Sequence, residues 1–362
     1  GRAKGGKPGP TAAVLGELDA VGCPTSPKAD PATGAAHACG HNLQISTMLA
    51  AACGIVKSGV LPELAGDVVF FGVPAEEYIE IAYRKKLVES GKLHFMSGKG
   101  ELIYEGAFDD IDMAMQMHAA KNMPKPTVSI GESSNGFVGK TERYIGKTAH
   151  AATWPEEGIS ALTPVLELFN IVNAMRLEIG DKGKILGIIR DGGDQAIFIP
   201  DHCSAEFTIR SFSMKYKWEL FHRFIKICEN VAAITGTRFE YEMIDLSYED
   251  IRNNPVLEDT LAENFKVLGE ELCPRLKEQG IGCTDMGNVT HALPGIQAYI
   301  RLRPGLRVHT PEFEEATGSP DGYRAIEAAA KGMAMTAVDI LSDSSKMEAV
   351  RKAFSEMKAQ YE

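Results

Sequence analysis

The sequence predicts an α/β protein in which a doubly wound, mostly parallel sheet carries an inserted ferredoxin-like βαββαβ domain. In the two outer parts of the chain, short apolar segments alternate with helical patterns, which favours a parallel sheet covered by helices on both faces. The middle part has the order βαββαβ, which is complete in itself. A chain of 362 residues is also longer than a single hydrophobic core usually supports, so two domains are expected.

Four short apolar segments are the expected strands of the outer sheet. They cover residues 11–18, 68–75, 111–118 and 296–302. Between the first two, residues 42–58 place apolar side chains on one helical face, and Gly59 is suited to end that helix. A long amphipathic helix is expected after Asp321.

The inserted part has its own strands and helices. Strands are expected at residues 137–145, 184–189, 203–212 and 238–246, and helices at 156–179 and 214–234. We therefore expect a discontinuous domain of residues 1–136 and 253–362 around an insertion of residues 137–252. The first ten residues contain neither an initiator Met nor the apolar core of a signal peptide, which leaves open an incomplete N-terminus.

Composition and charge exclude several classes of protein. Hydrophobic residues make up 44% and charged residues 24%, as in folded globular chains. With 38 Lys and Arg against 49 Asp and Glu, the net charge of -11 offers no basic field for nucleic acid. No apolar run reaches the roughly 18 residues of a membrane span. The seven cysteines form no CxxC pair, so a disulfide framework is not indicated and a reducing, cytoplasmic setting is expected.

Chemically active side chains follow three of the predicted strands. Asp19 follows the first, Glu76 and Glu77 follow the second, and His118 ends the third. Because the carboxyl ends of parallel strands meet at one edge of a sheet, these side chains are expected to lie close together. Of two adjacent carboxylates, one can bind a cation while the other moves the proton of a water. Taken alone, such a pair is more typical of a solvated helix start, and a lone histidine in the position of His118 is more often a core residue than a ligand.

The densest cluster is the segment HACGH at residues 37–41, which places Cys39 and His41 at the mouth of the predicted helix. A thiolate and an imidazole are good ligands for zinc and related divalent ions. The alternative is a helix start with an incidental buried cysteine. The same choice between ligand and core residue applies to His309. His150, at the end of the first inserted strand, is a candidate to bond a carbonyl oxygen or is an exposed strand-end residue.

Five segments together resemble the aminoacylase, hippurate-hydrolase and auxin-conjugate-hydrolase family of metallopeptidases, the M20 amidohydrolases. In the family's order they are HACGH at 37–41, PAEE at 74–77, GKTAHAA at 146–152, TDMGNVTH at 284–291 and HTPEF at 309–313. The resemblance runs from about residue 9 to residue 341. Asn42 and the segment 106–112 resemble the aminobenzoyl-glutamate-hydrolase branch more closely.

The resemblance implies a two-metal site and a catalytic base. Its implied metal ligands are Cys39, His41, Glu77, His118 and His309. Glu76 is then the general base, and Asp19 orients a ligand. The two divalent ions are expected to be Zn, Mn, Co or Ni. The family's inserted domain dimerises and acts as a lid, so the resemblance also implies a homodimer in which His150 reaches the partner subunit's active site.

The expected substrate is an N-acyl or aryl-acyl amino acid or a small dipeptide, cleaved at its amide bond by metal-activated water. Arg210, which follows an inserted strand, is a candidate to bind a substrate carboxylate, or it makes an ordinary surface ion pair. Asn288 and His291 either line the pocket or brace its loop. The chain departs from the family at Ile197, where relatives have Asn, and in a Lys-rich, helical excursion over residues 78–99.

Two other functions remain open from the sequence. Cys39 is a candidate nucleophile of a cysteine amidase, with a histidine as its base. A metal-stabilised protein that binds without catalysis is the alternative outside enzymes. Sensitivity to a chelator, rather than to a thiol reagent, distinguishes the metal-dependent hydrolase from the first of them.

Overall fold

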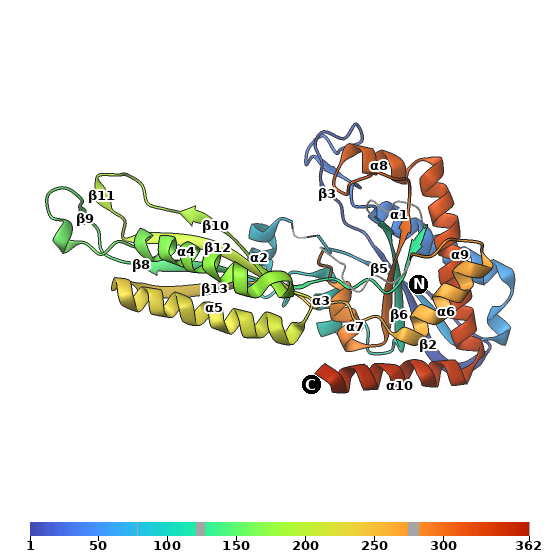
Figure 1. Ribbon diagram of the computed structural model, residues 1–362. Coiled ribbons are helices and arrows are strands. Elements are labelled where there is room, and N and C mark those ends of the chain that lie inside the picture. Colours follow the sequence, from blue (N-terminus) through green and yellow to red (C-terminus); the bar gives the residue numbers. More distant parts are fainter. Residues whose placement is uncertain (78, 121–126, 274–281, 362) are drawn as a thin grey trace. The chain divides into compact units, whose positions relative to one another are not determined.

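The computed structural model describes residues 1–77, 79–120, 127–273 and 282–361 (Figure 1). The chain forms two compact units. Unit 1 comprises Gly1–Ser134 and Ile251–Glu362, and unit 2 comprises Asn135–Asp250. The expected insertion, 137–252, differs from unit 2 by two residues at each end. Each unit is described by itself below.

Unit 1 is built on a six-stranded, mainly parallel sheet, as predicted. Its strands, in spatial order, are β1 (Arg2–Ala3), β5 (Ala65–Val73), β2 (Lys7–Glu17), β6 (Met113–Ala120), β14 (Gly295–Arg301) and β7 (Val128–Ser129). The central strands pair in parallel, whereas β1 and β7 are two-residue antiparallel edge strands. All four predicted strands are therefore present. The edge strands β1 and β7 are so short that they expose few unpaired backbone N–H and C=O groups. A separate small hairpin joins β3 (Val21–Gly22) to β4 (Ala35–Ala36).

Helices cover both faces of this sheet because its strands carry apolar side chains on both sides (Figure 1). In β2, Ala12 and Val14 pack on one face, and Ala13 and Leu15 on the other. The first face is covered by α1 (His41–Ser58), α6 (Pro255–Val267), α8 (Pro311–Thr317), α9 (Pro320–Ser342) and α10 (Ser344–Tyr361). The second is covered by α3 (Gly98–Tyr104) and α7 (Met286–Ala292). Near-continuous apolar strands of this kind are typical of parallel sheets buried on both faces.

The long amphipathic helix expected after Asp321 is present as α9, but the chain does not end in it, because α10 follows after a break at Asp343. The backbone of Asp343 is extended, with φ −133° and ψ 103°. Its carboxylate accepts a hydrogen bond from the backbone N–H of Ser345 at 2.9 Å. An Asp before a helix accepts hydrogen bonds from backbone N–H groups of the first turn, which have no partner within the helix. This cap explains why α9 ends and α10 begins here although the segment after Asp321 contains no proline.

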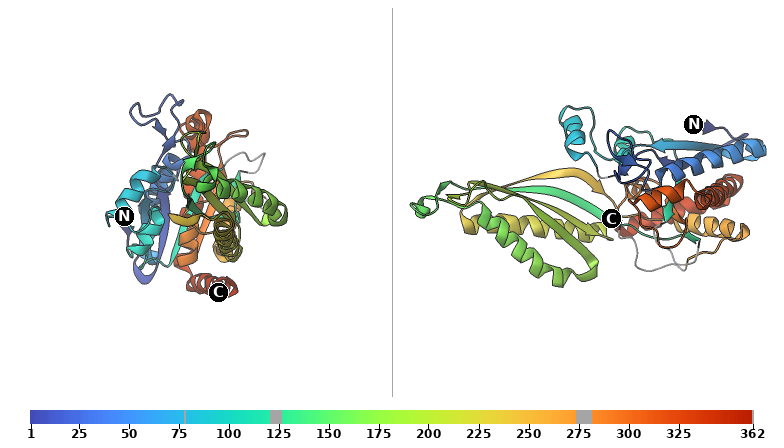
Figure 2. Two further views of the ribbon diagram at one scale, coloured as in Figure 1. Left: turned by 90° about the vertical axis from the view of Figure 1, so that its left-hand side faces the viewer. Right: turned by 90° about the horizontal axis from the view of Figure 1, so that it is seen from above.

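Unit 2 is a four-stranded antiparallel sheet with two helices on one face (Figure 2). Its elements are β8 (Gly136–Ile145), α4 (Leu162–Ile179), β10 (Gly183–Asp191), β12 (His202–Ser211), α5 (Met214–Thr235) and β13 (Arg238–Tyr248), and the sheet order is β10-β12-β8-β13. A small second sheet pairs β9 (Ala149–His150) with β11 (Phe198–Ile199). The order of the main elements is the predicted βαββαβ. The role of the unit as a lid or dimerisation domain stays a prediction.

Two further expectations need correction or comment. The helix expected from residue 156 begins only at Leu162, because Pro155–Glu157 forms a short 3-10 turn and Gly158 is extended. The excursion expected over 78–99 contains α2 (Ile81–Glu89) and the start of α3, while Tyr78 lies outside the described residues. Among the helices of the described residues, none has the length and apolar character needed to cross a membrane.

Candidate metal centre

The turn into α1 brings Cys39 and His41 to the carboxyl end of β6. Gly40 adopts a left-handed conformation with φ 94°, which glycine reaches without strain. A Cβ atom on Gly40 would lie 3.0 Å from the Cβ of Ala119, so the turn also packs closely against β6. The small residue between Cys39 and His41 therefore lets both side chains approach the strand that carries His118.

His118 presents one ring nitrogen to this cluster and anchors the other. Its Nδ1 lies 2.8 Å from the carbonyl oxygen of Ala119, which identifies Nδ1 as the protonated donor. Its Nε2 lies 3.6 Å from the Sγ of Cys39. Burial lowers the pKa of His118, so the ring is neutral and its Nε2 lone pair is available to a metal ion.

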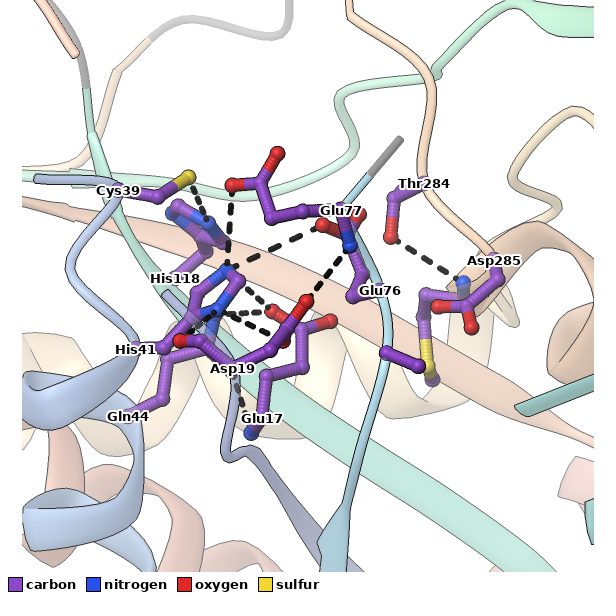
Figure 3. A network of polar contacts seen from close by, with 12 residues as sticks. Glu17, Asp19, Cys39, His41, Gln44, Glu76, Glu77, His118, Thr284 and Asp285 are labelled. Atoms are coloured by element: carbon purple, nitrogen blue, oxygen red, sulfur yellow. Dashed lines mark hydrogen bonds and ion pairs between the residues drawn. The ribbon is translucent and has the colours of Figure 1, made fainter. Parts of the chain in front are cut away.

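The turn after β5 supplies two carboxylates. Figure 3 shows Glu76 and Glu77 near the ring of His41, and the Nε2 of His41 lies 3.9 Å from an oxygen of each. Ala75 precedes them with φ 59°, an unusual conformation for a residue with a side chain. The Oε1 of Glu77 lies 3.5 Å from the Nε2 of His309, which also has a positive φ of 65°. Such backbone outliers cluster at functional sites.

The five predicted ligands form two overlapping groups that share Cys39. One group is Cys39, His41 and His118, and the other is Cys39, Glu77 and His309. Within each group, the candidate ligand atoms lie within 4.8 Å of one another. Among the described residues, the buried Nε2 of His41 and Oε1 of Glu77 have no hydrogen bond of good geometry, although the Oε2 of Glu17 and the Nε2 of His309 lie 3.0 Å and 3.5 Å from them. Both atoms therefore remain available to a metal ion. The donor set of thiolate, imidazole and carboxylate fits zinc and related divalent ions.

Asp19 contacts two of these ligands, as expected of a residue that orients them. The Nδ1 of His41 lies 3.0 Å from the carbonyl oxygen of Asp19 and 3.1 Å from its Oδ1. Its Oδ2 accepts a hydrogen bond from the backbone N–H of Glu77 at 2.8 Å. One side chain thus fixes both the ring of His41 and the turn that carries Glu77.

Glu76 differs from Glu77 in its electrostatic surroundings. Burial raises the pKa of Glu76 well above its ordinary value, and the negative charges of Glu17 and Glu77 raise it further. In Glu77, burial also favours the neutral form, but the contact with His309 outweighs it and the pKa is lowered. Two adjacent carboxyl groups with opposite shifts are suited to different tasks, one to hold a proton and one to bind a cation.

A wholly buried charge network under this cluster was not predicted. It consists of Glu17, Lys99 and Asp285, each with 0% of its surface exposed. The Nε2 of His41 lies 3.0 Å from the Oε2 of Glu17. Glu17 is the last residue of β2 and lies two residues before Asp19. Side chains two residues apart in an extended segment point to the same side, so the position of Asp19 could have indicated that Glu17 is near the site. A buried lysine in a Lys-rich segment gives no such signal.

The remaining predicted site residues belong to neither of the two ligand groups. Asn288 and His291 are on α7 in unit 1. His150 is in unit 2, on β9 rather than at the end of β8, and its Nδ1 accepts a hydrogen bond from the backbone N–H of Thr153 at 3.2 Å. Arg210 lies within β12 rather than after it, with its guanidinium 5.9 Å from the ring centre of Phe137.

Comparison with known proteins identifies peptidases and amidohydrolases as relatives of this chain. The family model described as peptidase family M20/M25/M40 matches residues 13–337. A Xaa-Arg dipeptidase of Mus musculus is 30% identical over 334 residues, covering 90% of this chain and 70% of that protein. A p-aminobenzoyl-glutamate hydrolase of Escherichia coli (strain K12) is 24% identical over 404 residues, covering 94% and 79%.

Solved structures show the same fold. A dinuclear metal binding peptidase of the M20 family from Bacillus subtilis has a TM-score of 0.70 at 20% identity, covering 94% of this chain and 84% of its own. An aminobenzoyl-glutamate utilization protein from Klebsiella pneumoniae has a TM-score of 0.63 at 16% identity, covering 93% and 73%. The match over most of the chain establishes that this protein belongs to peptidase family M20/M25/M40 and is a metal-dependent amidohydrolase.

Proposed function

We propose that the protein uses two divalent cations to cleave the amide bond of an N-acyl amino acid or a small dipeptide. The observation that carries this proposal is the pair of ligand groups sharing Cys39, with Glu76 next to one of the ligands. The names of two relatives, a dipeptidase and an aminobenzoyl-glutamate hydrolase, both denote cleavage of an amide bond to an amino acid. This supports the substrate class.

In this mechanism Cys39, His41, Glu77, His118 and His309 hold the cations. Two such cations polarise a carbonyl group and lower the pKa of water. Glu76 takes the proton of the water that attacks the scissile carbonyl and delivers it to the leaving amine, a task that its raised pKa favours. Asp19 keeps the ring of His41 and the backbone of Glu77 in place during the reaction. His150 donates a hydrogen bond to the developing oxyanion, a contact worth about 3 kcal/mol.

Glu76→Gln tests the role of the base. The amide retains the size of the side chain but accepts no proton, so turnover of a panel of N-acyl amino acids and dipeptides should be abolished while metal content stays intact. Glu63→Gln, at a carboxylate whose side chain is 79% exposed, is the matched control and should behave as the wild type. Normal turnover by Glu76→Gln would exclude this assignment.

The rival mechanism makes Cys39 a nucleophile, and its electrostatic surroundings oppose that role. Burial raises the pKa of the Cys39 thiol, whereas a catalytic cysteine needs a lowered pKa. We expect dialysis against a strong chelator to abolish activity, and Zn²⁺, Mn²⁺ or Co²⁺ to restore it. Full activity after removal of the metal, together with inactivation by iodoacetamide, would favour the cysteine mechanism. Membership of a hydrolase family disfavours the alternative of a binding protein without catalysis.

Arg210 of unit 2 is proposed to bind a substrate carboxylate, and Asn288 and His291 of unit 1 are proposed to contact the substrate. The buried Nε of Arg210 makes no hydrogen bond within the described residues, so a donor remains for a ligand. Arg210→Ala should raise KM for substrates with a free carboxylate more than for their amides. Arg143→Ala, at a partly exposed arginine paired with Glu242, is the control. Equal effects on acids and amides would contradict this role.

We also propose a homodimer in which His150 completes the partner subunit's active site. The edge strand β10 of unit 2 has exposed apolar side chains, with Leu186 44% and Ile188 49% exposed. An uncovered edge of this kind tends to pair, here about a two-fold axis. Mixing inactive Glu76→Gln chains with inactive His150→Ala chains should restore up to about half of the wild-type activity per heterodimer. No recovery after demonstrated subunit exchange would show that His150 does not act across the dimer.

A further inference from the structure

The buried network of Glu17, Lys99 and Asp285 adjoins the candidate ligands through the contact of Glu17 with the Nε2 of His41. The Nζ of Lys99 is 2.5 Å from the Oε1 of Glu17 and 2.6 Å from the Oδ1 of Asp285. The backbone N–H of Lys99 donates a second hydrogen bond to Asp285 at 2.9 Å. One ammonium group therefore stands between two carboxylates, all three without exposed surface.

Glu17 is held from several sides, and its remaining contact is with a candidate metal ligand. Its Oε1 accepts hydrogen bonds from Lys99 and from the amide of Gln116 at 2.8 Å. Its Oε2 accepts one from the amide of Gln44 at 2.6 Å and lies 3.0 Å from the Nε2 of His41 (Figure 3). These contacts fix the distance between the Glu17 carboxylate and the atom of His41 that faces Glu76 and Glu77.

The sequence brings Lys99 to this position through a close approach of two loops. Gly98 packs against the turn that carries Glu76, and a Cβ atom there would lie only 1.6 Å from the carbonyl oxygen of Pro74. The buried Arg84 on α2 fastens the same excursion, because it donates hydrogen bonds to the carbonyl oxygens of Ala75 at 3.4 Å and Met96 at 3.1 Å. The packing of Gly98 and the hydrogen bonds of Arg84 thus hold the segment from α2 to α3 in a position where Lys99 contacts Glu17.

We propose that Lys99 is a positioning residue, which holds the Glu17 carboxylate beside the Nε2 of His41 and thereby sets the metal affinity of the centre. This inference rests on the proposed metal centre. A wholly buried carboxylate that loses its cation must rearrange, since an unpaired buried charge is strongly destabilising. Glu17 belongs to the immediate surroundings of the ligating nitrogen of His41, and removing a group of this kind typically changes metal affinity by about 10- to 100-fold. Burial by itself would lower the pKa of Lys99, but Asp285 and Glu17 raise it, so the side chain stays charged.

The test is a titration of chelator-treated protein with Co²⁺ against a competing chelator, followed by the absorption band of the Cys39 thiolate bound to Co²⁺. Lys99→Met keeps the length of the side chain and removes its charge, and we expect it to weaken Co²⁺ binding by about 10- to 100-fold. Lys92→Met, the same change at an exposed lysine of the same excursion, should bind as the wild type. The Lys99→Met/Glu17→Gln protein should bind Co²⁺ no more weakly than Glu17→Gln alone, because Lys99 acts through the Glu17 carboxylate.

Asp285→Asn separates positioning from stability. It removes the other carboxylate of the network but leaves the contact between Lys99 and Glu17, so Co²⁺ affinity should stay within about threefold of wild type. If Lys99→Met does not fold, the comparison of Glu17→Gln with Asp285→Asn decides, and only the former should weaken binding. Equal affinities for Lys99→Met and Lys92→Met, or equal losses for Glu17→Gln and Asp285→Asn, would overturn the inference. A wild-type protein that binds no Co²⁺ would instead overturn the proposed function.

Discussion

Asp19→Asn should weaken metal binding even though it changes almost no volume. The two oxygens of Asp19 face different donors, with Oδ2 accepting the backbone N–H of Glu77 at 2.8 Å and Oδ1 lying 3.1 Å from the Nδ1 of His41. An asparagine has one acceptor oxygen and one NH₂ group. One of the two donors would then face another donor, so the ring of His41 or the turn of Glu77 must move.

Placing an NH₂ group where a charged oxygen now lies 3.1 Å from the Nδ1 of His41 costs about 2 kcal/mol, as much as a hydrogen bond to a charged group. Since 1.4 kcal/mol corresponds to a factor of ten, the metal dissociation constant should rise about 30-fold. Zn²⁺ or Co²⁺ binding to chelator-treated protein, measured against a chelator of known affinity, gives this number directly. Asp30→Asn is the control, because Asp30 lies in the adjacent loop and is exposed. Affinity of Asp19→Asn within about threefold of wild type would refute the reasoning.

Two further predictions concern stability. Burial raises the pKa of Glu142 to about 8 and lowers the pKa of Lys140 to about 8, so the two groups make the free energy of unfolding fall from about pH 4.5 to 8 and rise again above it. Relative to Lys140→Met/Glu142→Gln, the wild type should therefore be least stable near pH 8 in urea unfolding, and a pH-independent difference would contradict this. Gly98→Ala, whose Cβ would meet the carbonyl oxygen of Pro74, should lower the unfolding free energy by about 1–3 kcal/mol. Gly54→Ala, in a helix with open space around it, should raise it by up to about 1 kcal/mol, and equal effects of the two changes would be inconsistent with this packing.

The fold was predictable where the sequence pattern and the tertiary structure depend on the same residues. The strands β2, β5, β6 and β14 are apolar runs because they are buried on both faces, and each predicted strand overlaps the observed one. The errors arose where a local polar contact decided the outcome. The cap at Asp343 divides a continuous amphipathic pattern, and the turn at Pro155 delays α4 without altering its periodicity.

The same distinction applies to the site. Asp19, Glu76 and Glu77 follow buried strands, so the rule that strand ends converge brought them together without knowledge of distances. Lys99 follows no strand, and its partner Asp285 is 186 residues away in the chain. A buried ion pair between distant segments leaves no periodic trace in either, which is why the network behind the ligands required the structure.

The chain leaves unit 1 and returns to it at neighbouring points. The backbone N–H of Ile251 donates a hydrogen bond to the Oγ of Ser134 at 3.2 Å. In unit 2, the adjoining strands β8 and β13 are paired, with Phe137 opposite Tyr248. Bringing residues 134 and 251 together costs chain entropy, but the contacts within unit 2 already hold its two ends close to each other. For the folding of unit 1, the insertion therefore costs about as much as a short loop. A tight turn joining residues 134 and 251 should be able to replace the insertion without distorting the parallel sheet.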